Sequence, residues 1–159
     1  MKLSRSGFVA SAAVAAVGAA AAAPKIATAS AQTLEATIYG SSLGIKGPDG
    51  KPHDVTIPSN FVIKAGVPVT MTVTNYDEGP HSFTAPDMPL NATVKGGNEV
   101  SEGKVLPVKT TFTFTAKKKG VYRWYCALPC DAGHGSWDMT PGYGGPSQEG
   151  FMAGYFVVQ

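Results

Sequence analysis

Two cysteines, a histidine and a methionine lie close together in the last third of the sequence. Cys126 and Cys130 are the only cysteines among 159 residues, and His134 and Met139 follow them. Thiolate, imidazole and thioether donors select copper or zinc over magnesium or calcium. A thioether is a poor ligand for zinc and a common weak axial ligand for copper. This donor set therefore favours copper.

One more ligand is expected from elsewhere in the chain. His81 is the best candidate, because it follows Gly79 and Pro80 and directly precedes the apolar start of another strand. Cys126 ends a predicted strand and is followed by residues 127–150, which show no periodicity. A rigid strand end with a returning loop can close around an ion. We therefore expect the cysteines and both histidines to converge at one end of the fold.

Short strands position these residues. Residues 67–75 alternate valine and methionine with threonine, a period of two that is typical of a half-buried strand. Nineteen glycines and twelve prolines suit strands joined by turns. We predict an all-β antiparallel β-sandwich of about seven strands. The predicted strands are residues 34–39, 55–64, 67–75, 105–116, 121–126 and 155–159.

The first 31 residues are predicted to be a signal peptide. Lys2 and Arg5 precede an apolar run rich in alanine, and residues 29–31 (Ala-Ser-Ala) form a cleavage site. Residues 32–159 then form one exported domain, periplasmic or extracellular, with no membrane span after cleavage. Without the three basic residues of this segment, the chain has ten basic and eleven acidic residues. This balance excludes a nucleic-acid partner.

Two segments resemble a known family. The chain resembles the cupredoxins in two segments. These are residues 121–126 (Val-Tyr-Arg-Trp-Tyr-Cys), which lead into the Cys/His/Met segment, and residues 81–83 (His-Ser-Phe). The cupredoxins are small copper proteins with a Greek-key β-sandwich that transfer electrons. The Cys-x3-Cys-x3-His spacing from Cys126 to His134 resembles the binuclear copper (CuA) domain of cytochrome c oxidase subunit II and nitrous oxide reductase.

The resemblance implies a ligand set. Cys126 and Cys130 would bridge two copper ions, and His81 and His134 would each bind one of them. Leu128 would contribute its backbone carbonyl. The family places a methionine three residues after the second histidine, where this chain has Trp137. Met139 is the predicted axial ligand, with Met152, at the head of the last strand, as the alternative.

Other sites remain open from the residues alone. A mononuclear type 1 (blue) site would use His81, His134, Met139 and one of the two thiols. The same cysteine and methionine residues could serve a copper chaperone or storage protein. The two cysteines could instead form a disulfide in an exported sandwich without metal.

The leading hypothesis is an electron-transfer protein that is not itself an enzyme. The sequence has no nucleophile elbow, phosphate-binding loop or paired-carboxylate motif. We expect a monomer whose redox partner is a cytochrome or an oxidase-type protein. His53 is expected at the surface, Met71 and Met88 in packing roles, and the basic residues 117–119 in a solvated turn.

Overall fold

The computed structural model describes residues 30–43, 45–47, 50–128 and 151–159 of the chain. Within these ranges the chain forms strands and one short 3-10 helix, η1 (Ser41–Leu43). No helix among the described residues has the length and apolarity needed to cross a membrane. The strands are β1 (Gln32–Tyr39), β2 (Val55–Ile57), β3 (Phe61–Ile63), β4 (Val69–Asn75), β5 (His81–Ala85), β6 (Leu90–Val94), β7 (Asn98–Ser101), β8 (Lys104–Leu106), β9 (Val108–Phe114), β10 (Gly120–Tyr125) and β11 (Ala153–Val158).

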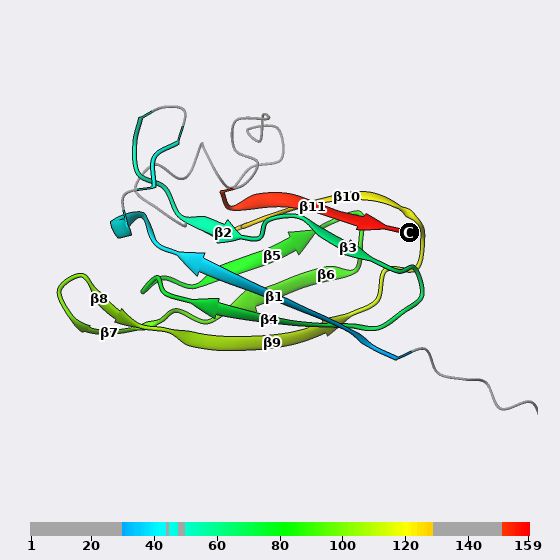
Figure 1. The fold of residues 1–159 in the computed structure, drawn as a ribbon, viewed down its shortest axis with the longest axis horizontal. Coiled ribbons are helices and arrows are strands. Elements are labelled where there is room, and N and C mark those ends of the chain that lie inside the picture. Colours follow the sequence, from blue (N-terminus) through cyan, green and yellow to red (C-terminus); the bar gives the residue numbers. More distant parts are fainter. Residues whose placement is uncertain (1–29, 44, 48–49, 129–150) are drawn as a thin grey trace, which may run out of the picture.

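Two sheets form the sandwich and enclose one hydrophobic core (Figure 1). The first sheet has the order β2-β1-β4-β9, and the second has the order β3-β11-β10-β5-β6. A separate hairpin, β7-β8, projects at one end. The predicted all-β Greek-key sandwich is confirmed, with one difference. The pairs β1/β4 and β3/β11 are parallel, whereas the other pairs are antiparallel.

The alternation of apolar and polar residues in the sequence correctly predicts which side chains of a strand face the core. In β4, Val69, Met71 and Val73 are fully buried, and the threonines between them are partly exposed. In β10, Trp124 points into the core, where its ring stacks on Phe83 with centroids 4.2 Å apart. Such aromatic pairs stabilise the core beyond the area that they bury. The packing role expected for Met71 is therefore confirmed, and Trp124 is part of the same core.

Two of the predicted strands are each divided by a proline. Residues 55–64 form β2 in the first sheet and β3 in the second, and the chain crosses between the sheets at residues 58–60. Residues 105–116 form β8 and β9, separated at Pro107. Proline has no backbone N–H to donate to a neighbouring strand, so a ladder tends to end there.

The prediction for His53 is wrong. Its side chain is fully buried and meets the ring of Phe151 edge to face, with centroids 6.0 Å apart. Its backbone N–H donates to the carbonyl of Ile45 at 2.9 Å. Burial of this polar side chain depends on contacts with distant residues, and no local pattern signals them.

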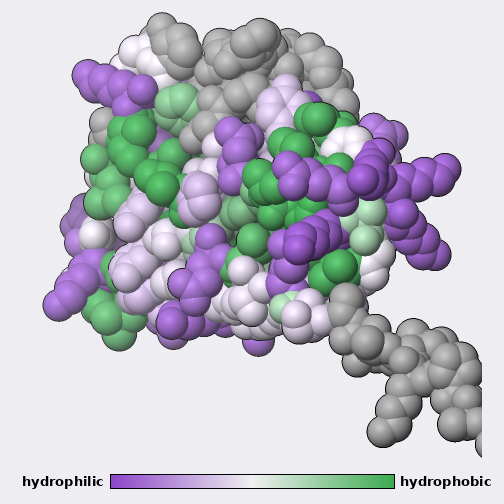
Figure 2. Space-filling model, turned by 45° about the vertical axis from the view of Figure 1, so that its right-hand side comes forward, coloured by the Kyte–Doolittle hydropathy of each residue, from purple (hydrophilic) through white to green (hydrophobic). Residues whose placement is uncertain are grey.

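The end of the sandwich that faces away from Cys126 is basic at its surface. Residues 117–119, three lysines, are exposed in the connection between β9 and β10, as predicted. Figure 2 shows strongly hydrophilic side chains beside hydrophobic ones on the side of the molecule that carries this connection. Met88 lies at the same end and is 4% exposed, so its predicted packing role is confirmed.

Gly154 provides a test of the packing around Trp124. It lies opposite Trp124 in the β10/β11 ladder, and a Cβ there would overlap the carbonyl oxygen of Ser59, which accepts the indole N–H of Trp124 at 2.8 Å. We predict that Gly154→Ala lowers the free energy of unfolding by about 1–3 kcal/mol in a denaturant titration. Val121→Ala, an exposed position on β10, is the control and should change it by less than about 0.5 kcal/mol.

Candidate metal centre

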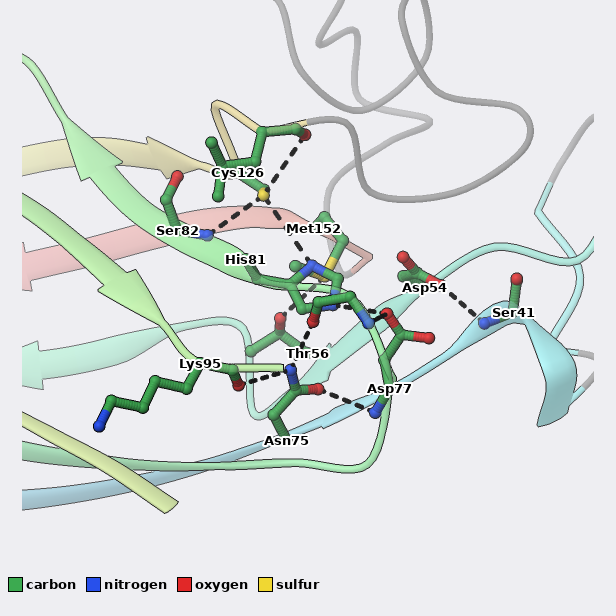
Figure 3. Close-up of polar contacts among 12 residues, drawn as sticks. Ser41, Asp54, Thr56, Asn75, Asp77, His81, Ser82, Lys95, Cys126 and Met152 are labelled. Carbon is green, nitrogen blue, oxygen red and sulfur yellow. Dashed lines mark hydrogen bonds and ion pairs between the residues drawn. The ribbon is translucent and has the colours of Figure 1, made fainter. Parts of the chain in front are cut away.

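The centre of the site is a cysteine and a histidine from neighbouring strands. Cys126 directly follows β10, and His81 begins β5, which is paired with β10. The Sγ atom of Cys126 lies 4.0 Å from Nδ1 of His81, and both residues have no solvent exposure (Figure 3). The sequence predicts these two residues at one end of the sandwich, and the structure places them together there.

The sulfur of Cys126 has two further polar contacts. The backbone N–H of Ser82 donates to Sγ at 3.3 Å, and the carbonyl oxygen of Leu128 lies 3.7 Å from it. The Ser82 hydroxyl accepts the N–H of Ala127 at 2.8 Å, which fixes the chain immediately after Cys126. A backbone N–H aimed at sulfur favours the thiolate, the form that binds metals.

An acid fixes the orientation of the histidine. Nε2 of His81 lies 3.1 Å from Oδ2 of Asp77, so this nitrogen carries the proton and donates it to the carboxylate. When the ring is neutral, Nδ1 is left with a lone pair directed toward Cys126. A carboxylate on the outer nitrogen sets the tautomer and makes the imidazole a better ligand.

Asp77 is itself held by the backbone around it. Its Oδ2 also accepts the N–H of Gly79 at 2.9 Å, and its own N–H donates to Oδ1 of Asn75 at 2.9 Å. A Cβ at Gly40 would overlap Oδ1 of Asp77, so this position must lack a side chain for the carboxylate to lie where it does. Asp77 was not predicted as a site residue from the sequence, where its place four residues before His81 is the only local signal.

The charge environment favours a protonated His81 in the metal-free protein. Burial by itself lowers the pKa of the imidazole, but the hydrogen bond to Asp77 raises it. The Cys126 sulfur, through a hydrogen bond and its charge, and the charge of Asp54 act in the same direction. Together they raise the pKa of His81 from 6.5 to about 9.

Met152 also lies at this end. It immediately precedes β11, is fully buried, and its carbonyl oxygen accepts the N–H of Cys126 at 2.9 Å. Residues bonded in this way across an antiparallel pair have side chains on the same face. The Sδ atom of Met152 accepts a hydrogen bond from the hydroxyl of Thr56, with Oγ1 and Sδ 3.2 Å apart (Figure 3).

These residues fit a soft metal ion. A nitrogen and a sulfur bonded to one such ion at about 2.1 and 2.3 Å are at most about 4.4 Å apart. The separation of 4.0 Å between Nδ1 and Sγ is within that limit. Both atoms are buried, and the second nitrogen of the imidazole is already occupied. Three predicted ligands, Cys130, His134 and Met139, lie outside the described residues.

The comparisons with known proteins concern the fold. No family model and no curated protein matches the chain. Among solved structures it is similar to a purple cupredoxin from Nitrosopumilus maritimus, with 20% identity over 79% of this chain and 99% of that one, at a TM-score of 0.37. It is also similar to auracyanin A, a "blue" copper protein from Chloroflexus aurantiacus, with 17% identity over 82% and 100% of the two chains, at a TM-score of 0.44. A third is a blue copper oxidase from Nitrosomonas europaea, with 14% identity over 82% of this chain and 39% of that one, at a TM-score of 0.49.

The His81–Asp77 pair predicts a pH-dependent stability. Because the pKa of His81 is about 9 in the folded protein against its ordinary value of 6.5 in the unfolded chain, the pair stabilises the metal-free fold fully below pH 6.5. That contribution is lost as the pH rises through 9. We expect Asp77→Asn to lower the free energy of unfolding by about 1.5–3 kcal/mol at pH 6, and by much less at pH 10.

Urea titrations of the reduced, metal-free protein across this pH range measure the difference. Asp87→Asn is the control, because Asp87 is exposed and follows β5 at its other end. A gap between wild type and Asp77→Asn that is equal at both pH values would contradict the assigned pairing.

Proposed function

We propose that this protein transfers single electrons through a copper–thiolate centre at the Cys126 end of the sandwich. The observation that carries the proposal is the buried pair of Nδ1 of His81 and Sγ of Cys126, with the outer nitrogen of His81 held by Asp77. Copper bound there would supply a one-electron redox couple. The protein's own residues fix the ligands and exclude water.

Rigidity of the ligands supports electron transfer. A one-electron carrier works best when its ligands hardly move between redox states, which requires them to be positioned by the fold. His81 is fixed by Asp77 and by its place in the β5/β6 ladder, opposite Val94. Cys126 is fixed by the N–H of Ser82 and by its own bond to the carbonyl of Met152.

Dryness of the site supports the same role. Cys126 and Met152 are fully buried, and the Trp124–Phe83 stack fills the core behind them. A dry, aromatic surround keeps water from the metal and tunes its potential. We therefore propose that the protein acts as an electron carrier and not as an enzyme by itself.

The type of centre that we favour is binuclear, of the CuA kind. In it Cys126 and Cys130 would bridge two copper ions, His81 and His134 would each bind one, and Leu128 would contribute its carbonyl. The carbonyl of Leu128, 3.7 Å from the sulfur of Cys126, is consistent with that role. The alternative is a mononuclear type 1 site. In that case Cys126 would be the thiolate ligand, because it is the cysteine beside His81.

We favour Met152 over Met139 as the axial ligand of the copper. Met152 lies directly across the β10/β11 pair from Cys126 and is fully buried there.

The proposed function also includes export through a signal peptide and a cytochrome or oxidase-type protein as the redox partner.

Cysteine substitutions and metal content test this proposal. We predict that the purified protein binds two copper ions and gives a seven-line electron paramagnetic resonance pattern from an electron shared between them. Cys126→Ser and Cys130→Ser should each abolish the pattern, because both sulfurs bridge both ions. Thr72→Ser, at a partly exposed position on β4, is the control.

The other outcomes separate the alternatives. One copper with a four-line pattern, lost in Cys126→Ser and kept in Cys130→Ser, would indicate the mononuclear site. Tightly bound copper that does not cycle between redox states would indicate storage or delivery. A protein that takes up no copper would overturn the proposed function.

Methionine substitutions identify the axial ligand. We predict that Met152→Leu keeps copper bound but shifts its visible absorption and its reduction potential, because an axial thioether bond is long and weak. Met139→Leu should change neither. The reverse pattern would assign the axial role to Met139.

A further inference from the structure

We infer that Thr56 is a positioning residue that holds the sulfur of Met152 and thereby sets the reduction potential of the centre. This inference rests on the proposed function. Its physical basis is one hydrogen bond, from the hydroxyl of Thr56 to Sδ of Met152, with the two heavy atoms 3.2 Å apart. Both residues are buried, with Thr56 at 1% exposure and Met152 at 0%.

Burial makes this contact a specific one. A hydroxyl group shielded from water needs a hydrogen-bond partner inside the protein, because leaving it unpaired is costly. A thioether is a weak acceptor and is seldom the partner of choice. Here the Thr56 hydroxyl donates to it nevertheless. The hydrogen bond therefore affects the sulfur atom of Met152 as well as the stability of the fold.

Thr56 is placed firmly enough to hold a flexible side chain. Its backbone N–H donates to the carbonyl of Phe151 at 2.8 Å, and β2 is paired with β1 at Ile38. Threonine is branched at Cβ and is stiff at χ1. Methionine has three rotatable side-chain bonds, so Met152 would otherwise adopt several rotamers.

The bond also changes the electronic character of the sulfur. A thioether sulfur has two lone pairs, and a hydroxyl proton directed at one of them withdraws electron density while leaving the other for a metal. A weaker axial donor favours the reduced, less positive state of the metal. The axial ligand and the hydrogen bonds around the sulfur atoms are among the factors that tune such potentials.

Thr56 holds the sulfur of Met152 from the other sheet of the sandwich. Thr56 belongs to the edge strand of the first sheet, whereas Cys126, His81 and Met152 belong to the second. The hydrogen bond therefore fixes the axial sulfur relative to the opposite sheet. The shape of the sandwich, and not the flexible methionine, then determines where the sulfur lies.

The test compares Thr56→Val, which keeps the shape of the side chain but removes the donor, with Thr56→Ser, which keeps the donor. Redox titration of the copper-loaded protein should give a lower potential for Thr56→Val and nearly the wild-type potential for Thr56→Ser. In the Met152→Leu background, Thr56→Val should cause no further shift. Thr72→Val is the matched control, since it removes an exposed hydroxyl, bonded to that of Thr111 at 3.0 Å.

A second readout uses the metal-free protein. With methionine methyl groups labelled with ¹³C, the resonance of Met152 is identified by its loss in Met152→Leu. Thr56→Val should shift and broaden this resonance because the side chain is released, whereas Thr56→Ser and Thr72→Val should leave it in place.

The outcomes distinguish this inference from the proposed function. A copper-loaded protein whose potential is the same with Thr56→Val, or shifts equally with and without Met152, would overturn the role of Thr56 and leave the proposed function intact. A wild type that takes up no copper would overturn the proposed function and the tuning role with it.

Discussion

The position of β10 between β5 and β11 is the constraint on which the site depends. β10 ends at Tyr125, so Cys126 emerges at the same edge of the sheet at which β5 begins with His81 and β11 is preceded by Met152. Antiparallel pairing on both sides makes this alignment unavoidable, because a strand that ends at one edge has neighbours that begin there. The candidate ligands Cys126, His81 and Met152 therefore lie at the same edge of the second sheet.

Electrostatics at this edge would be unfavourable without Asp77. A buried, protonated imidazole needs a negatively charged partner, and the carboxylate of Asp77 supplies one at 3.1 Å. The carboxylate in turn is satisfied by the N–H of Gly79, and Asn75 fastens the same turn by donating to the carbonyls of Gly79 and Lys95. The desolvation cost of the ion pair is thus offset by fixed polar groups, and the ring of His81 is left with one available orientation.

Part of this arrangement can be predicted from the sequence and part cannot. The period of two in residues 67–75 and 121–126 predicts β4, β10 and their inward faces, and hence the place of Cys126 at the end of a strand. His81 is predictable because its glycine-proline turn precedes an apolar segment. The parallel pairs, the division of residues 55–64 between two sheets and the burial of His53 depend on long-range pairing, which leaves no local signal.

The residues that sequence reasoning missed are those that act on a ligand rather than serve as one. Asp77 looks like an ordinary acid in a polar turn, and Thr56 looks like one more threonine in a short strand. Both are recognisable only once the two sheets are packed together. Asp77 lies in the connection between β4 and β5, and Thr56 lies on β2 of the first sheet. The side chains that they contact, those of His81 and Met152, lie at the edge of the second sheet. The relative positions of the candidate ligands therefore depend on how the two sheets pack together, and a substitution that shifts one sheet against the other would alter the candidate site as well as the core.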